Sequence, residues 1–307
     1  MKKSKLFITT ALSLFFGLNF LASAYAQDRS DPLFQSGARE IGPSGEQQEL
    51  KKQGLDSLAR AKKIGKITAC ADPYAFPYAT SQGDPPGFDV EIFRAMASQA
   101  GLKAEMFWAD TGTRGGLGRA LRNSIDKGAC DFFMGLAYGD DDEIKDHKLT
   151  LTKPYMGMGY VLVVQGAAAN NKSLADIKKN KVKLGVAMST PMDDYLFTNG
   201  YDRALYLQNR RIMEAMISGE IDASMVFSTS LGEAKRDYKD AKFKLADGHV
   251  PEPGLRYNAA WAVPIKETTM KQFVEESFEK LLKSGDMKKI VESYGIPFYP
   301  PFQEQGK

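Results

Sequence analysis

Four consecutive acids, Asp140 to Glu143, lie two residues after an apolar run that reads "CDFFMGLA". Such a short apolar run is typical of a buried strand, so the acids are expected in a loop where a core strand ends. Their carboxylates could bind a hard cation such as calcium or a lanthanide, but an EF-hand loop spaces its ligands alternately and adds Gly-x5-Glu. We therefore predict a solvated, partner-facing charged loop that repels anionic metabolites, and no metal site.

A second group of side chains suited to binding lies in "CADPYAFPYA", after the first predicted strand. It carries Asp72, Tyr74, Phe76 and Tyr78. Ligand pockets are typically lined by aromatic side chains with a few polar groups, so we expect at least one of these aromatics to line a cleft. A purely structural interpretation stays open, in which Phe76 belongs to the core and the prolines only shape the loop.

Further candidates for a cleft are Trp108, Arg114 and Tyr138. Arg114 lies among glycines in "TGTRGG", where a guanidinium and backbone amides could bind an anionic or carbonyl group. An exposed arginine paired with Asp110 is the alternative, and such a surface pair contributes little. Ser189 and Thr190 in "AMSTP" precede a predicted helix and could cap it.

The sequence contains no recognisable catalytic set. The stretch "GTRGGLG" is glycine-rich but lacks the lysine and the spacing of a phosphate-binding P-loop. With only His147 and His249 in the chain, a metal site rich in nitrogen or sulfur ligands is not expected. We therefore predict a non-catalytic protein without a cofactor.

Cys70 and Cys130 are the only cysteines. An exported protein would allow them to form a disulfide. If the two predicted strands that carry them are parallel neighbours, however, the sulfurs could lie too far apart to bond. Both possibilities stay open at this point.

The first residues indicate export. A basic start, a short apolar stretch and the sequence Ala24-Tyr25-Ala26 predict a signal peptide over residues 1–26, cleaved before Gln27. The 41 lysines and arginines exceed the 38 acids by three, and three lysines belong to this leader, so the mature chain would be neutral. We expect a periplasmic protein that neither binds nucleic acid nor inserts into a membrane. A retained membrane anchor is the alternative.

The remaining chain alternates predicted strands and helices, which implies right-handed crossovers and mainly parallel sheets. Residues 27–63 are expected to form an extension, polar at first and helical later. The alternation begins at Lys66 with "KITACAD" and restarts after the glycine-rich stretch "PYMGMGY". In such sheets ligands bind beyond the carboxyl ends of the strands, where the acidic segment lies.

Five motifs occur in the order found in the amino-acid-binding periplasmic solute-binding proteins of family 3: "GFDVEIFRAMA", "GLGRALRNSIDKGACDFFMGL", "LTKPYMGMGYVLVV", "KLGVAMSTPMDDYL" and "MEAMISGEIDASMVF". The chain resembles this family over about residues 64–297. The resemblance implies an α/β, two-lobe type II periplasmic binding protein fold with a mainly parallel, helix-flanked sheet in each lobe. Its ligand cleft would lie between lobe 1 (64–155 and 261–307) and lobe 2 (161–256), with hinges at 156–160 and 257–260.

Members of this family hold an amino acid with an arginine for the carboxylate and an aspartate for the ammonium. The resemblance places the arginine position at Glu143 and the aspartate position at Phe227. It also implies that the loop of Ser189 and Thr190 donates amides to a ligand. A carboxylate would be repelled by the acidic segment, and an ammonium facing Phe227 would lose water without gaining a partner. An amino acid ligand is therefore not expected.

More narrowly, "CADPYAFPYA", "TKPYMGMGYVLVV" and "ESYGIPFYP" resemble the MxaJ/XoxJ-type branch, which is associated with methanol dehydrogenases that use pyrroloquinoline quinone (PQQ). This resemblance implies an accessory that engages the dehydrogenase, or its cytochrome c, in activation or maturation. Its cleft would take a protein segment more readily than PQQ, whose three carboxylates need more cations than Arg114. The alternative is an ABC importer subunit that delivers a small polar solute other than an amino acid to a permease.

Overall fold

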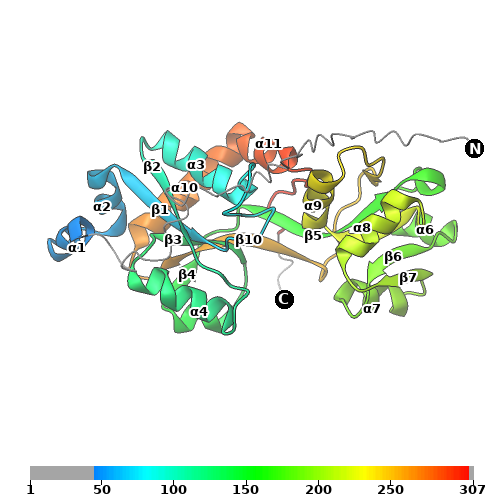
Figure 1. Cartoon of the computed structure of the whole chain (residues 1–307), viewed down its shortest axis with the longest axis horizontal. Helices are drawn as coiled ribbons and strands as arrows, with labels where there is room; N and C mark the ends of the chain where they lie inside the picture. Colours follow the sequence, from blue (N-terminus) through cyan, green and yellow to red (C-terminus); the bar gives the residue numbers. More distant parts are fainter. Residues whose placement is uncertain (1–44, 304–307) are drawn as a thin grey trace, which may run out of the picture.

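The computed structural model describes residues 45–303. The predicted signal peptide and residues 27–44 of the predicted extension lie outside the described residues. The described part of the extension forms α1 (Gly45–Lys52) and α2 (Ser57–Ile64) at one end of the molecule (Figure 1). Asp56 caps α2 by accepting a hydrogen bond from the Ala59 amide, and Gly65 ends it in the left-handed conformation.

The first sheet and its helices form one lobe, called lobe 1 below. Its strands run in the order β2-β1-β3-β10, with β1 parallel to both β2 and β3, and β10 antiparallel to β3 and β4. These strands are β1 (Lys66–Ala71), β2 (Lys103–Trp108), β3 (Phe132–Ala137), β4 (Leu149–Leu151) and β10 (Arg256–Pro264). The helices are α3 (Phe88–Gln99), α4 (Gly116–Asn123), α5 (Asp142–Asp146), α10 (Thr268–Ser284) and α11 (Asp286–Ser293).

The second sheet forms lobe 2 at the other end of the molecule (Figure 1). In it β5 pairs antiparallel with β8 and β9, while β6 lies parallel between β8 and β7. The strands are β5 (Met156–Val164), β6 (Leu184–Ala187), β7 (Arg203–Tyr206), β8 (Ala223–Phe227) and β9 (Lys244–Leu245). The helices are α6 (Leu174–Lys179), α7 (Pro191–Thr198), α8 (Asn209–Ser218) and α9 (Thr229–Asp237).

Two long strands join the lobes. The first half of β5 pairs antiparallel with β10, with Gly159 opposite Arg256. The second half of β5, from Tyr160 onward, pairs with β8 of lobe 2. Both predicted hinge segments, 156–160 and 257–260, lie inside these regular strands. Nearly every residue of β5 is buried, because the strand runs through the centre of both sheets.

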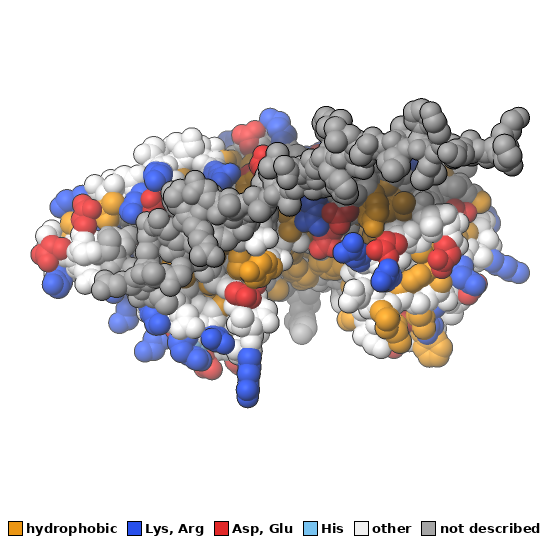
Figure 2. Space-filling view, in the orientation of Figure 1, with side chains coloured by type: hydrophobic (Ala, Val, Ile, Leu, Met, Phe, Trp, Pro, Cys, Tyr) orange, Lys and Arg blue, Asp and Glu red, His pale blue; other side chains and the backbone are white. Residues whose placement is uncertain are grey.

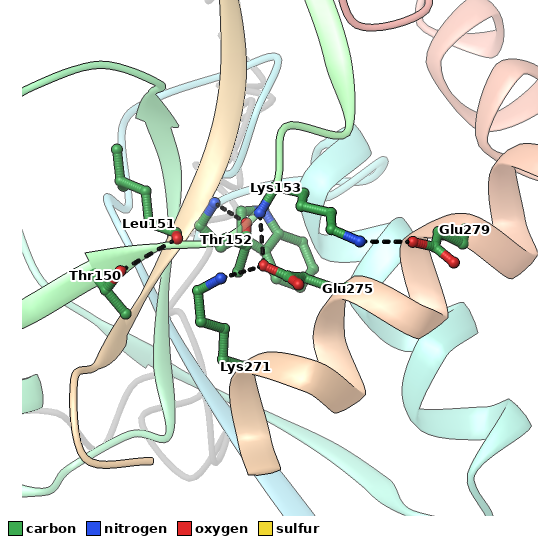
Figure 3. A network of polar contacts seen from close by, with 8 residues as sticks. Thr150, Leu151, Thr152, Lys153, Lys271, Glu275 and Glu279 are labelled. Atoms are coloured by element: carbon green, nitrogen blue, oxygen red, sulfur yellow. Dashed lines mark hydrogen bonds and ion pairs between the residues drawn. The ribbon is translucent and has the colours of Figure 1, made fainter. Parts of the chain in front are cut away.

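The entry into β5 is anchored to lobe 1 by a polar network (Figure 3). The Lys153 amide donates to Glu275 Oε1 at 2.8 Å, and the Lys153 ammonium lies 3.1 Å from Glu279 Oε1, both on α10. Beside it the Trp261 amide donates to Thr152 Oγ1 at 3.2 Å. The chain therefore leaves lobe 1 from a fixed position.

Each lobe has its own hydrophobic core. In lobe 1 the ring of Phe132 stacks on Trp261 with centroids 5.0 Å apart, and Phe278 of α10 packs edge-on against the same indole. Cys70 and Cys130 form a disulfide in this lobe, with Cα atoms 5.7 Å apart. Of the two possibilities left open by the sequence, the structure has the bonded one, because Cys130 lies just before β3 and not deep within it. In the described part of the chain, no helix is both long and apolar enough to cross a membrane.

Two segments differ from the sequence-based expectation. The acidic segment is not simply a loop, since its last residues form the short helix α5, for which Asp141 is the N-cap. The segment "TSLGEAKRD", for which no element was expected, forms α9. Helix α9 packs against lobe 1, where a Cβ on Gly232 would lie 3.1 Å from the Tyr294 carbonyl oxygen.

Candidate functional site

A hollow of about 190 Å³ lies where the strands of lobe 1 end. Its wall comes from the ends of β1 and β3, the loop between β1 and α3, and the starts of α3 and α4. Asp72, Tyr78, Asp89, Thr111 and Gly135 are the members of this wall used below. None of the residues lining the hollow is a lysine, an arginine or a histidine, so every ionisable group of its wall is an acid or a phenol.

Asp72 presents a fixed carboxylate in this wall. Its Oδ1 accepts from the Tyr74 amide at 2.7 Å, and its Oδ2 accepts from the Thr111 amide at 2.9 Å and from the Thr111 hydroxyl. These bonds join the loops that follow β1 and β2. Because a carboxylate has further lone pairs, Asp72 can still accept a hydrogen bond from a ligand.

Gly135, near the end of β3, lines the hollow beside the ring of Tyr78. It lies exposed near the end of β3 with φ 77°, a conformation that favours glycine. A Cβ there would lie 3.9 Å from the ring of Tyr78. The Tyr78 hydroxyl in turn lies 2.5 Å from the Tyr257 hydroxyl and donates to Met158 Sδ at 2.7 Å. The hollow is thereby linked to both strands that join the lobes.

Asp89 is a second carboxyl group of this wall, and it is fully buried. Burial raises its pKa from 3.8 to about 7, although the hydrogen bond from Tyr155 favours the charged form. The Tyr155 hydroxyl donates to Asp89 Oδ1 at 2.5 Å. Asp89 therefore connects the start of α3 to the beginning of β5. Near pH 7 a large fraction of its carboxyl groups is protonated and neutral.

On lobe 2 the end of β6 leads into the loop of Ser189 and Thr190. Thr190 caps α7 by accepting from the Asp193 amide at 3.2 Å, while its hydroxyl donates to the Ala187 carbonyl at 2.7 Å. The Ser189 amide donates to Asp193 Oδ2 at 2.9 Å. The Asp193 carboxylate also accepts from Arg203 Nε at 2.6 Å. The Asp193 carboxylate therefore already accepts the hydrogen bond that the Ser189 amide could otherwise donate to an anionic ligand.

Phe227 closes the end of β8 against the joining strands. Its ring stacks on Tyr257 with centroids 5.5 Å apart and meets Tyr160 edge-on at 5.6 Å. It also packs against the core of lobe 1. Phe227 is thus an aromatic contact between the lobes, and Tyr257 connects it to Tyr78 in the wall of the hollow.

The acids that follow β3 have local partners. Asp141 caps α5 by accepting from the Glu143 amide at 2.8 Å. Lys145 forms ion pairs with Asp140 and Asp142. The carboxylate of Glu143 lies against Gly118 in the first turn of α4, where a helix dipole favours negative charge.

Tyr138 lies beside these acids and lines a different hollow of about 960 Å³, together with Arg256, Tyr257 and Phe302. Among the described residues, no group of three or more histidine, cysteine, aspartate or glutamate side chains is placed to hold a metal ion. Asp140 and Asp141 of the acidic segment line the same hollow as Tyr138.

Several predicted cleft residues do not line the lobe 1 hollow, among them Trp108, Phe76 and Arg114. Trp108 packs its half-buried ring against the core of lobe 1, at the end of the edge strand β2 of that sheet. The guanidinium of Arg236 lies over the ring of Phe76, 4.3 Å from the ring centroid. The ring centroids of Phe76 and Tyr294 are 6.0 Å apart. Arg114 is exposed and, within residues 45–303, forms no ion pair with Asp110.

Of the aromatics in the loop after β1, Tyr78 lines the hollow, while Tyr74 is 67% exposed to solvent. Sequence reasoning missed Asp89, Thr111 and Asp193. The acid in "GFDVEIF" could have been noticed, since it interrupts an otherwise apolar helix face. Nothing in the local sequence marks Thr111, whose partner Asp72 comes from another segment. Asp193 could have been noticed, because it follows Thr190 by three residues at the start of a predicted helix, the spacing of a capping box.

The sequence profile of the bacterial extracellular solute-binding proteins, family 3, matches residues 66–297. A comparison with curated protein sequences finds no match. The L-cystine solute receptor of Neisseria gonorrhoeae, in its unliganded open conformation, has a TM-score of 0.64 at 18% identity, covering 81% of this chain and 100% of that chain.

Two further solved structures are similar. A polar amino acid ABC uptake transporter substrate-binding protein from Streptococcus thermophilus has a TM-score of 0.63 at 19% identity, covering 80% of this chain and 92% of that chain. An ancestral cyclohexadienyl dehydratase has a TM-score of 0.59 at 20% identity, covering 78% and 96%. At these identities the likeness shows a shared fold, the mixed α/β type II fold expected from the sequence.

Proposed function

The chain belongs to the bacterial extracellular solute-binding proteins of family 3, and from this premise we propose that it binds a small, polar, neutral or cationic solute that is not an amino acid. The solute would lie between the lobes, against Asp72 and Tyr78 on lobe 1. A periplasmic binding subunit would then pass it to the permease of an ABC importer. The similar protein from Streptococcus thermophilus is itself described as an ABC transporter component.

One observation supports this ligand class above all others: the charges around the site do not suit a carboxylate. The wall of the lobe 1 hollow holds Asp72 and Asp89 and no basic side chain. On lobe 2, the Ser189 amide is already bonded to Asp193. An anion would be repelled by Asp72 without gaining a cation, whereas a hydroxyl or ammonium group could donate to it.

The two positions at which the family resemblance places the groups that hold an amino acid also support this proposal. Glu143 stands where the family's arginine is expected, and its carboxylate is turned toward α4. Phe227 stands where the ammonium ligand is expected, and its ring is stacked on Tyr257. We further propose that the protein is not an enzyme, since the hollow's lining contains no histidine, cysteine or lysine that could work with Asp72.

A thermal shift assay against four classes of compound tests the proposal: amino acids, carboxylates, polyols and amines. A ligand that binds only the folded protein raises its melting temperature by mass action. We expect a hit among the polyols or amines, and we expect Asp72→Asn to abolish it. Asp142→Asn removes a charge from a side chain that is 97% exposed, and should leave the hit unchanged. A hit with a plain α-amino acid would overturn the proposal.

A second candidate function is the one implied by the narrower resemblance, an accessory of a PQQ-dependent methanol dehydrogenase or its cytochrome c. The comparisons do not bear on this branch, so it stays a prediction. One observation favours a protein partner. Met188, Phe197, Leu205 and Leu207 are 42%, 65%, 49% and 79% exposed, and Figure 2 shows hydrophobic side chains gathered over α7 and β7. Such patches often mark protein contacts.

Capture with the purified protein as bait separates the two functions. If the accessory function holds, periplasm from methanol-grown cells yields a quinoprotein, identified by mass spectrometry and by its PQQ absorbance. Leu207→Asp should abolish that capture without changing the melting temperature, because the side chain is mostly exposed. If the importer function holds, no dehydrogenase is captured and the compound assay gives the hit.

A further inference from the structure

The last described residues cross both strands that join the lobes, and we propose that residues 296–303 form a strap that limits how far the lobes can move relative to each other. The segment begins in lobe 1, where Ile296 is buried in the hydrophobic core. It then runs along β5 and β10 and contacts lobe 2. The chain therefore connects the lobes a third time, through non-covalent contacts.

The middle of the strap is bonded to both joining strands. The Gly157 amide of β5 donates to the Tyr299 carbonyl at 2.9 Å, which makes an antiparallel bridge. On β10, Asn258 bonds Phe302 twice: its side-chain amide donates to the Phe302 carbonyl at 2.9 Å, and its Oδ1 accepts from the Phe302 amide at 2.7 Å. Gly157 and Asn258 both lie in the predicted hinge segments, so bending there would strain these bonds.

Side chains extend the strap into lobe 2. The Tyr299 ring packs against a core cluster of lobe 2, and its hydroxyl donates to the His249 carbonyl at 3.3 Å. The guanidinium of Arg256 lies over the ring of Phe302 at 4.3 Å, while Arg256 Nη1 donates to the Pro251 carbonyl at 3.2 Å. The strap therefore holds residues of lobe 1, of both joining strands and of lobe 2 in one set of contacts.

Gly157 is shaped for this contact. A Cβ at position 157 would lie 2.6 Å from Cδ2 and 2.9 Å from Cζ of Phe302, well inside van der Waals contact. Its φ is not in the left-handed region, so the strand itself would accept alanine. The glycine is therefore explained by the ring that it accommodates, an alternative to the flexibility that a glycine-rich hinge suggests.

Phe302→Ala tests the strap in the complete chain without any ligand, so the test does not depend on the proposed function. Small-angle X-ray scattering would measure the distribution of distances between the lobes, and hydrogen exchange would report on Gly157 and its neighbours. We expect a broader distribution and exchange at Gly157 that is roughly fivefold faster or more, as for loss of about 1 kcal/mol of protection.

Phe298→Ala is the matched control, because this half-buried ring of the same segment packs against the core of lobe 1. It should lower stability while leaving the distance distribution unchanged. Gly157→Ala, with Gly45→Ala as its control, gives a second test. Nothing lies within 4 Å of a Cβ on Gly45, so only the change at Gly157 should release Phe302 and broaden the distribution. Unchanged scattering and exchange in both Phe302→Ala and Gly157→Ala would overturn the proposal.

Discussion

Individual residues decide which ligands the two lobes could hold. Where the family resemblance places a carboxylate clamp and an ammonium ligand, this chain has Glu143 and Phe227. The structure gives both a different local role, since Glu143 lies against the start of α4 and Phe227 stacks on Tyr257. These two positions therefore contribute to the fold, and under the proposed function they do not hold a zwitterion.

This account predicts that an amino acid site can be restored. The double variant Glu143→Arg, Phe227→Asp supplies both charges, so a panel of amino acids should then raise its melting temperature. At about 100 times the Kd, the stabilisation would be about 2.7 kcal/mol. Either single variant, or Asp142→Arg with Phe227→Asp, lacks one properly placed charge and should show no shift. A shift in the wild type would contradict the account.

The buried carboxyl of Asp89 predicts a pH dependence. Burial raises its pKa from 3.8 to about 7, so between these values the native protein holds a proton that the unfolded chain has released. The stability from this group is therefore full below pH 4 and is lost as pH rises through 7. The shift corresponds to up to about 4 kcal/mol.

Urea unfolding at pH 5 and pH 8 would measure this loss. In Asp89→Asn, which cannot ionise, stability should fall less between the two pH values than in the wild type. Asp131 is the control, because burial also raises its pKa, to about 6. Asp131→Asn should reduce the loss of stability mainly at the lower pH values, below its pKa of about 6. Equal pH dependence in the wild type and Asp89→Asn would show that Asp89 does not control it.

At the scale of elements, short helices depend on their caps. Helix α7 has only eight residues, and its first turn is held by Thr190 and by the bond between Ser189 and Asp193. Its length is marginal for an isolated helix, so these contacts and its packing against β6 maintain it. The sequence suggested capping for both residues, and the structure shows that Thr190 is the one whose side chain caps.

Thr190→Ala should therefore lower the free energy of unfolding by about 1 kcal/mol, the usual cost of losing a side-chain cap. Ser189→Ala keeps the backbone amide that bonds Asp193, so it should cost much less. Urea unfolding of the two variants at one pH gives the comparison. An equal loss in both would mean that the loop, and not the cap, supports the helix.

At the scale of the whole molecule, the two lobes have separate cores and different restraints. Lobe 1 contains the disulfide, which joins residues separated by 60 positions. Lobe 2 contains no cysteine, and the joining strands, α9 and the strap connect it to lobe 1. Stability should therefore respond to cysteine removal lobe by lobe.

We expect the double variant Cys70→Ala, Cys130→Ala to destabilise lobe 1 by about 4 kcal/mol. A cross-link of this span lowers the conformational entropy of the unfolded chain by an amount that corresponds to this free energy. Native-state hydrogen exchange would show faster exchange in β1 and β3, while β6 and β8 of lobe 2 should keep their protection. Equal losses in both lobes would show that they unfold as one unit.

The sequence by itself determined the α/β class, most helices and strands, and the family, because apolar periodicity and motif order are local properties of the chain. It also identified Asp72, Tyr78 and Phe227 as residues of interest. It left the disulfide and the choice between core and cleft for Phe76 undecided, because side-chain direction in a loop depends on what packs there.

Only the tertiary structure decided which groups meet. The contacts of Asp89 with Tyr155, of Asp72 with Thr111 and of the C-terminal strap with Gly157 join segments that are separated in the sequence. Contacts of this kind depend on distances in space, which hydrophobic patterns do not encode. The elements can therefore be predicted from the sequence, while the polarity of the site and the restraint on the lobes come from the packing.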